Sequence, residues 1–335
     1  MTGESAAAAL PYLRETAELV GPFLRHAVSQ IPEPMSEVIA HSLGPAGASE
    51  RAALVRAAWE LGGGPGVAIV PAAAAVELLH FSTLVIDDVL DDSDLRGGGP
   101  STRALYGDSC AVLAGEVLHT EAILALAHQW TVAGYTAPGV LSAIRALCGA
   151  HRLQCTGAYA DLRSEGQAAY TETGYLHVVR QTTGSLAEAC MVIGATLRSA
   201  PQDELRALAA YGGALGVALQ VRDDILDLVG DPELTGKELG GDLRRGKPRL
   251  PVIRALANLD GPARSWLADL IASRSAAPED IDAAVRLIVD AGGVEQSIDE
   301  VGRRCGEARR SLSGLGACGA LEFLDGLAVL VAESW

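Results

Sequence analysis

Two short acidic motifs are the residues in this sequence whose types and spacing could do chemistry. Each reads Asp-Asp-x-x-Asp and ends a long apolar stretch, at residues 87–91 and 223–227. If each motif is helical, aspartates four residues apart lie one above the other, so like charges are crowded together. Such a cluster is unfavourable unless it faces open water or binds cations. One motif could be a solvated helix end, but two with identical spacing predict a shared metal site.

The predicted ligand set favours magnesium. Mg²⁺ prefers oxygen ligands and keeps several coordination positions for water or a substrate phosphate. A diphosphate would bind to so many carboxylates only through such ions, which also cancel the charge that develops on the leaving group. We therefore predict Mg²⁺ as the cofactor, with six aspartates as its ligands and as the catalytic residues: Asp87, Asp88, Asp91, Asp223, Asp224 and Asp227.

An apolar cavity is expected beneath the acids. Phe81, Ser82 and Thr83, which precede the first motif, and Tyr159 are the residues predicted to line it. A polar mouth above an apolar cavity suits a substrate with an ionic head and a hydrocarbon tail. Aromatic rings, which stabilise carbocations, are scarce in a chain with three Phe and four Trp.

The elements that must position these motifs are helical. Ala and Leu dominate the composition, and no strand-like alternation of useful length occurs. We predict one all-α domain over residues 1–335. Helices are expected at residues 4–30, 35–42, 49–61, from the apolar stretch after 66 to about 95, 109–131, 139–163, 171–197 and 202–229, with four or five more between 251 and 335.

Composition excludes several other classes of function. The net charge of −16 argues against a nucleic-acid or anionic-membrane partner. No uninterrupted apolar run is long enough to span a membrane, and the N-terminus lacks the basic start of a signal peptide. We therefore expect a cytoplasmic protein with no stable membrane insertion. Its six scattered cysteines are expected to be reduced thiols.

A basic, glycine-rich loop follows the second motif at residues 235–249. It concentrates basic residues in an otherwise acidic protein, and its glycines permit movement. We expect the loop to close over the diphosphate and exclude water. Lys237 and Lys247 are the residues in it that we predict to bind the diphosphate.

These features resemble the trans-isoprenyl diphosphate synthases, which form the polyprenyl synthetase family, from about Gly47 to the C-terminal helices. The resemblance implies an isoprenoid-synthase-type helical bundle around a central cavity, a homodimer and three Mg²⁺ ions. It also implies that an allylic prenyl diphosphate ionises with release of pyrophosphate, and that isopentenyl diphosphate attacks the cation. The diphosphate-binding residues that the resemblance implies are Arg51, His80, Arg96, Thr183, Gln220, Lys237 and Lys247.

Departures from the family pattern weaken one of its two diphosphate sites. The family's Lys and second Arg, which hold isopentenyl diphosphate, are Ala48 and Gly97 here. Each charged contact to an oxyanion is worth roughly 1.5–3 kcal/mol, so their loss weakens binding by about 3–6 kcal/mol unless Arg56 or Arg103 compensates. Two further departures are Thr182 for the Lys of a Lys-Thr pair, and Ala158 for the Gln of a Gly-Gln-x-x-Asp motif that ends at Asp161.

Three functions remain open from the sequence. The eroded site favours a terpene-synthase-like enzyme that ionises one allylic diphosphate and lets the cation cyclise or lose a proton. The alternative is a prenyltransferase that elongates an allylic diphosphate with isopentenyl diphosphate or an unusual acceptor, and the complete aspartate motifs favour it. A non-catalytic partner subunit is the third, although such subunits tend to lose the aspartates. The small Ser82 and Thr83 predict a C15–C20 or longer tail for either enzyme.

Overall fold

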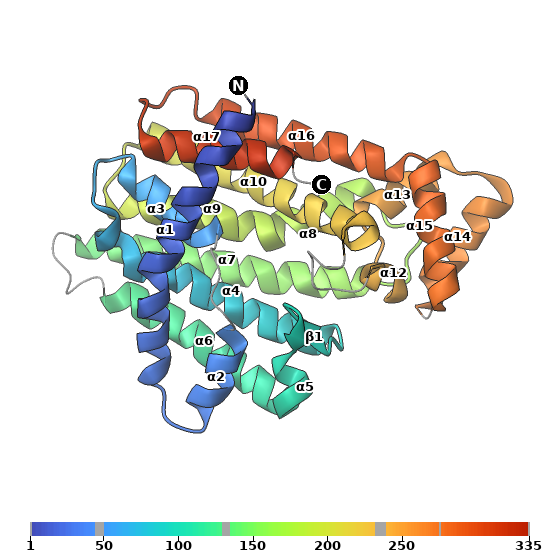
Figure 1. Cartoon of the computed structure of the whole chain (residues 1–335), viewed down its shortest axis with the longest axis horizontal. Helices are drawn as coiled ribbons and strands as arrows, with labels where there is room; N and C mark the ends of the chain where they lie inside the picture. The colour runs from blue at the N-terminus through green and yellow to red at the C-terminus, as the bar shows by residue number, and fades with distance from the viewer. Residues whose placement is uncertain (1, 44–49, 129–134, 232–238, 275, 334–335) are drawn as a thin grey trace.

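Helices make up almost all of the regular structure in the computed structural model, which describes residues 2–43, 50–128, 135–231, 239–274 and 276–333 (Figure 1). This confirms the predicted all-α fold. The longer helices are α1 (Thr2–Ser29), α2 (Met35–Leu43), α3 (Glu50–Glu60), α4 (Val70–Leu90), α6 (Asp108–His128), α7 (Ala137–Ser164), α8 (Glu172–Val179), α9 (Ser185–Leu197), α10 (Gln202–Val229), α13 (Leu250–Asn258), α14 (Gly261–Ser273), α15 (Pro278–Asp290), α16 (Gly293–Ser311) and α17 (Gly319–Glu333).

Several short elements complete the chain. They are the 3₁₀ turn η1 (Gly66–Ile69), the strands β1 (Leu95–Arg96) and β2 (Gly99–Pro100), α5 (Thr102–Tyr106), the π-helical turn η3 (Arg180–Gly184) and α12 (Gly241–Arg244). Most predicted helices are confirmed to within about three residues, and α10 has the predicted bounds. The predicted helix over 171–197 is interrupted, because η3 separates α8 from α9.

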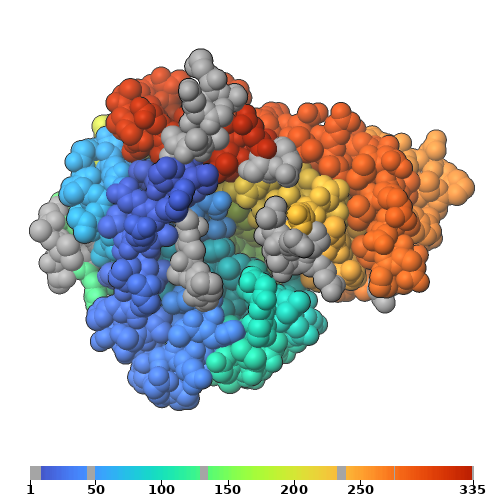
Figure 2. All heavy atoms as spheres, viewed as in Figure 1, coloured from blue at the N-terminus to red at the C-terminus, as the bar shows by residue number. Residues whose placement is uncertain are grey.

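The helices that carry the two motifs lie in the middle of the bundle. Helix α4 packs along α6, and α10 packs along α9 and α16, while α1 crosses the face seen in Figure 1. In Figure 2, α1 and α2 cover one side of this face, and α13–α15 project at the opposite end. Every residue from Ala72 to Leu79 is buried, which explains why α4 is apolar all round.

Two helical segments, Gly66–Leu90 and Asp108–His128, are long and apolar enough to span a membrane. They pack against each other, since Gly115 of α6 lies so close to Ile86 of α4 that an added Cβ would be 2.8 Å from the Ile86 side chain. In the first segment, 61% of the most apolar 18-residue stretch is buried inside the bundle, and in the second segment 39% is buried. Burial in the bundle therefore explains the composition of α4, whereas α6 keeps an exposed apolar face.

Helix α4 ends one turn earlier than the sequence predicts. Asp91 caps it, and Asp92 has a left-handed φ of +50°. The backbone N–H of Ser93 donates to the carbonyl of Asp88 at 2.9 Å, and that of Asp92 to the carbonyl of Val89 at 3.4 Å. These bonds form a Schellman motif, which ends a helix sharply. The first acidic motif is thus the last turn of α4.

A tight hairpin follows this helix end. Strands β1 and β2 pair Arg96 with Gly99, and the two residues between them, Gly97 and Gly98, have φ angles of +58° and +79°. Two successive residues with positive φ make a type I′ turn, which favours glycine. The hairpin therefore gives a local structural reason for a glycine at position 97.

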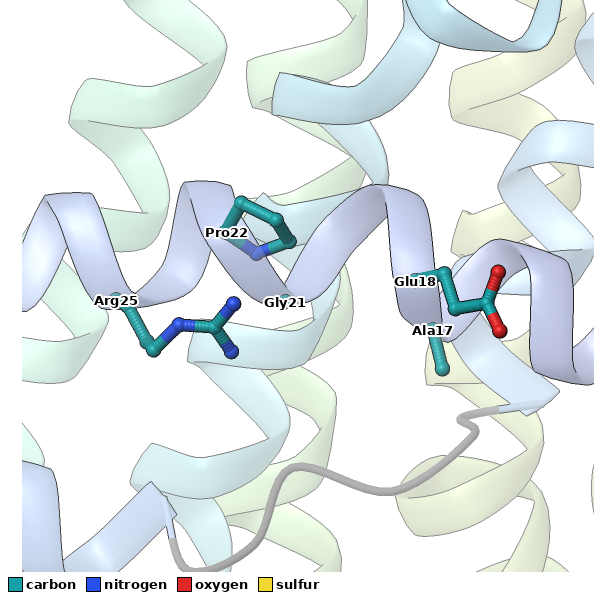
Figure 3. Close-up of a pocket in the computed structure, with 5 residues that line it drawn as sticks. All are labelled: Ala17, Glu18, Gly21, Pro22 and Arg25. Carbon is teal, nitrogen blue, oxygen red and sulfur yellow. The ribbon is translucent and has the colours of Figure 1, made fainter.

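Figure 3 shows an open pocket on α1, lined by Ala17, Glu18, Gly21, Pro22 and Arg25. All five residues belong to one helix, and the residues predicted from the acidic motifs are not among them. This pocket is therefore not the predicted substrate cavity.

Close helix contacts generate a stability prediction. An added Cβ at Gly194 of α9 would lie 2.3 Å from the Val55 carbonyl oxygen of α3, so Gly194→Ala should destabilise the protein by about 1–3 kcal/mol. At Gly149 of α7 an added Cβ meets no atom within 4 Å, so Gly149→Ala should be neutral or stabilise by up to about 1 kcal/mol. Urea denaturation measures both changes. Equal unfolding free energies for the two variants would contradict the prediction.

Candidate active site

One short segment after α10 joins the two acidic motifs. Lys247 Nζ lies 2.6 Å from Asp91 Oδ1 of the first motif. Five residues earlier, the backbone N–H of Asp242 donates to Asp227 Oδ2 of the second motif at 3.1 Å. Because this segment contacts both motifs, α4 and α10 present their carboxylates to the same site.

The middle aspartate of the first motif is bound by an arginine. Asp88 is 2% exposed and accepts hydrogen bonds from Arg96, at 2.5 Å from Nη2 and at 3.1 and 3.2 Å from Nε. Asp87 lies nearby with its pKa raised to about 6, mainly by burial and then by the charge of Asp91. The first motif therefore contains one neutralised carboxylate and two that repel each other.

The middle aspartate of the second motif is bound by neutral donors. Asp224 is 3% exposed, and it accepts from Gln220 Nε2 at 2.9 Å and from the Tyr175 hydroxyl at 2.5 Å. Burial raises the pKa of Asp224 to about 7, although Arg249 opposes that shift. The side chain of Asp223 is 60% exposed, and burial followed by the charge of Asp242 raises the pKa of Asp227 to about 6.

Partly buried arginines hold several of the acids together. Arg249 donates to Asp161 of α7 at 2.6 and 3.3 Å and to Asp242 at 3.0 Å. Arg245 Nη2 donates to Asp242 at 3.0 Å and lies 3.8 Å from Asp91. Burial alone would raise the pKa of Asp242, but Arg249, Lys247 and Arg245 hold it below its ordinary value. The charged segment thus ties α4, α7 and α10 together.

The predicted diphosphate ligands Thr183 and Gln220 lie beside the second motif. The Thr183 hydroxyl donates to Gln220 Oε1 at 2.6 Å, and Gln220 Nε2 in turn donates to Asp224 Oδ1. Thr183 reaches this position from the π-helical turn η3, a type of irregularity that is frequent at functional sites. The structure therefore brings these two residues together with Lys247 at one end of the bundle.

The predicted isopentenyl diphosphate residues form a second group. His80 is partly buried, and its pKa is lowered well below the usual range by burial, with further contributions from Arg51 and Arg96. These three residues therefore lie near one another. Lys237 and Ala48 lie outside the described residues.

The two arginines proposed as compensating residues are engaged elsewhere. Arg56 is 7% exposed and pairs with Glu60 at 2.7 Å and with Glu15 at 2.9 Å, between α3 and α1. Arg103 pairs with Asp92, Asp94 and Asp108 at 2.9–3.1 Å. Neither arginine stands in for the missing cations in this structure.

One predicted cavity residue, Tyr159, is placed differently by the structure. The other three, Phe81, Ser82 and Thr83, are buried or partly buried on α4. Tyr159 is 68% exposed, because it occupies the face of α7 opposite the buried Gly157. Ser82 is 2% exposed, Phe81 is partly buried against the core, and the Thr83 hydroxyl donates to the His80 carbonyl at 2.8 Å.

Sequence reasoning gave no individual role to three residues that shape the site. Arg249 was one basic residue among several in a loop, and Asp161 belonged to an incomplete motif. Tyr175 lies outside both acidic motifs, but its ring is 2% exposed and its hydroxyl binds Asp224. Only the spacing of Asp161 within its motif signalled a role.

The donor chemistry of the site fits Mg²⁺. Its acids supply hard oxygen ligands, and Asp87, Asp91 and Asp227 repel neighbouring acids. Within the described residues, no three Asp, Glu, His or Cys side chains already converge closely enough to hold a metal ion. Lys247 and Arg245 instead lie against Asp91. Metal binding at Asp91 would therefore require these cations to shift.

Comparisons with known proteins identify the family of this chain. The polyprenyl synthetase family model matches residues 32–288. A geranylgeranyl diphosphate synthase from Mycobacterium tuberculosis is 35% identical over 306 residues, covering 86% of this chain and 83% of that protein. A short chain isoprenyl diphosphate synthase from Methanocaldococcus jannaschii is 35% identical over 220 residues, covering 66% of this chain and 65% of that protein.

A solved structure has the same fold. The polyprenyl synthase from Caulobacter crescentus, crystallised with calcium and isoprenyl diphosphate, is 26% identical with a TM-score of 0.88 over 97% of both chains. An all-α bundle with two Asp-Asp-x-x-Asp motifs at one site defines an enzyme of the class I isoprenoid synthase type. This chain belongs to the polyprenyl synthetase family, and the members compared above are named as synthases of prenyl diphosphates.

The basic brace generates a second prediction. Arg249→Met would leave the carboxylates of Asp161 and Asp242 in a buried site without their main partner, so it should destabilise the protein by about 3–5 kcal/mol. Arg264→Met changes an exposed arginine of α14 and should alter stability by less than about 0.5 kcal/mol. Chemical denaturation followed by circular dichroism measures both. Matching transitions for the two variants would show that Arg249 is not a brace.

Proposed function

We propose that this chain is a Mg²⁺-dependent prenyltransferase that elongates an allylic prenyl diphosphate with isopentenyl diphosphate. The observation that carries this proposal is the 242–249 segment, which contacts Asp91 and Asp227 and so makes one site of both motifs. The names of the relatives support it, since both describe synthases of prenyl diphosphates.

The outer aspartates of each motif are the residues we propose as metal ligands. Asp88 and Asp224 accept hydrogen bonds within the protein on both carboxylate oxygens. Asp91 and Asp227 each accept on one oxygen, so we propose that Asp87, Asp91, Asp223 and Asp227 face the substrate. When bound, Mg²⁺ would cancel the charge that develops on the departing pyrophosphate. A set of three ions, as the family resemblance implies, belongs to this proposal.

Side chains around the acids would hold and orient the allylic diphosphate. Lys247 is a buried cation whose ammonium could move from Asp91 to a phosphate oxygen. Thr183 and Gln220 lie on the second-motif side, where they would contact the same group. Lys237 is proposed from its motif position alone. These contacts would fix the scissile C–O bond above the apolar residues that hold the tail.

Elongation is better supported than terpene-synthase-like cyclisation. The relatives compared above are named as synthases of short chain isoprenyl or geranylgeranyl diphosphate. The aspartates that a non-catalytic subunit tends to lose are all present. The weakened acceptor site does not remove Arg51, His80 or Arg96, so we expect weak binding of isopentenyl diphosphate rather than its exclusion.

Three finer statements complete the proposal. The small Ser82 and Thr83 support a product tail of C15–C20 or longer. A homodimer is supported by the exposed apolar residues on α6 and α7, which include Val112, Leu113 and Leu141. Family membership also supports our proposal of prenyl diphosphate substrates and a cytoplasmic location.

Turnover of defined substrates tests the proposed function. Purified protein with Mg²⁺ is incubated with geranyl, farnesyl or geranylgeranyl diphosphate, with and without isopentenyl diphosphate, and the products are separated by chromatography and mass spectrometry. A longer diphosphate that forms only with both substrates is the expected result. Hydrocarbon or alcohol from the allylic substrate alone would replace the proposal with a terpene synthase, and absence of turnover would replace it with a non-catalytic subunit.

The missing cation at position 97 generates a further prediction. Gly97→Arg should lower the KM for isopentenyl diphosphate about tenfold, because one charged contact to the diphosphate is restored. An added Cβ at Gly97 meets no atom within 4 Å, but the φ of +58° makes any side chain there strained. Gly97→Ser carries the same strain without the charge and is the matched control. Equal KM values for the two variants would place position 97 away from the acceptor.

A further inference from the structure

A buried tyrosine binds the centre of the second acidic motif. Tyr175 of α8 is 2% exposed, and its hydroxyl donates to Asp224 Oδ2 at 2.5 Å. Burial and the adjacent Asp224 raise the pKa of Tyr175 well above its usual value, so the phenol keeps the proton that it donates. A neutral donor therefore fixes this carboxylate without removing its charge.

The other oxygen of Asp224 is the end of a directed relay. Gln220 Nε2 donates to Asp224 Oδ1 at 2.9 Å, and the Thr183 hydroxyl donates to Gln220 Oε1 at 2.6 Å. Every donor in the relay points toward Asp224. Three elements, α8, η3 and α10, therefore converge on one carboxylate, whose orientation is fixed at both oxygens.

The relay also fixes the direction of the other acids on α10. Asp224 lies one residue after Asp223 and three before Asp227, in the last two turns of the helix. Because Asp224 points inward to Tyr175, helical geometry turns Asp223 to another face, where it is 60% exposed, whereas Asp227, three residues on, shares the face of Asp224. Without the bond to Tyr175, the Asp224 carboxylate could rotate and the end of α10 would lose a link to α8.

We propose that Tyr175 is a positioning residue for metal binding, acting through Asp224 on the carboxylates of Asp223 and Asp227. This inference rests on the proposed function, because it assumes that the second motif binds divalent metal. Loss of a partner that hydrogen-bonds a metal ligand typically lowers metal affinity about 10- to 100-fold. Tyr175 acts one residue further from the metal, through Asp224, so we expect Tyr175→Phe to raise the Mg²⁺ concentration for half-maximal turnover up to about tenfold.

A second buried tyrosine offers a matched control. Tyr211 of α10 is 0% exposed, and its hydroxyl donates to the Leu324 carbonyl at 2.6 Å. It lies thirteen residues before Asp224, about 20 Å away along the helix. Tyr211→Phe deletes the same atom from an equally buried place, so it reports the effect of a lost core hydrogen bond without any change at the site.

The experiment measures metal binding without substrate as well as turnover. Mn²⁺ is titrated into wild type, Tyr175→Phe and Tyr211→Phe and followed by electron paramagnetic resonance, and the Mg²⁺ dependence of turnover is recorded for each. We expect weaker Mn²⁺ binding and a higher Mg²⁺ requirement for Tyr175→Phe alone. Thermal unfolding of all three proteins is measured in parallel. Gln220→Met, which removes the other donor to Asp224, is the second variant if Tyr175→Phe does not fold, and the same weakening is expected.

A double-mutant cycle with Asp224→Asn tests the route of the effect. If Tyr175 acts through Asp224, Tyr175→Phe should weaken metal binding no further in that background. The inference is overturned if Tyr175→Phe binds metal as wild type does, if Tyr211→Phe weakens metal binding equally, or if the effect persists undiminished with Asp224→Asn. Failure of the proposed function is distinct, since wild type itself would then form no elongated diphosphate.

Discussion

Crowding of carboxylates between α4, α7 and α10 is the constraint on which the rest of the site depends. Acids from four segments meet there, and the buried ones would repel each other and take up protons if nothing compensated them. The raised pKa values of Asp87 and Asp227 show that compensation by the protein is incomplete. A site with residual negative charge, lined by oxygen atoms, is well suited to divalent cations.

The protein stabilises each of these carboxylates with a different partner. A guanidinium neutralises Asp88, whereas a phenol and an amide, both uncharged, hold Asp224. Arg249 pairs with Asp161 and Asp242. Lys247 and Arg245 lie against Asp91 of the first motif. This arrangement lets the protein stay folded without metal while its substrate-facing side remains acidic.

Sequence periodicity predicted the helices well because their apolar faces are regular. The bounds of α10 and the meeting of the two motifs followed from apolar spacing and from motif repetition. Tyr159 was misplaced because motif proximity says nothing about which face of α7 a residue occupies. The Arg249–Asp161 pair joins residues 88 positions apart, a contact that only tertiary structure specifies.

Local backbone chemistry explains the remaining differences. The left-handed Asp92 ends α4 although the following residues carry no proline, and Asp is a residue that tolerates this conformation. The interruption at η3 has no glycine or proline before its last residue, so its sequence offers no terminator. The end of α4 places acidic side chains at the site, and η3 places the Thr183 hydroxyl there.

The π-helical turn also sets which face α8 presents to α10. Tyr175 and Thr183 are eight residues apart, which on a regular α-helix would set them about 80° from each other. The widened turn absorbs one extra residue and brings them to within about 20°, so both can reach α10. A regular helix of the same length would turn Tyr175 away from Asp224 by nearly a quarter turn. On a regular helix the two side chains would share a face only if the segment were one residue shorter.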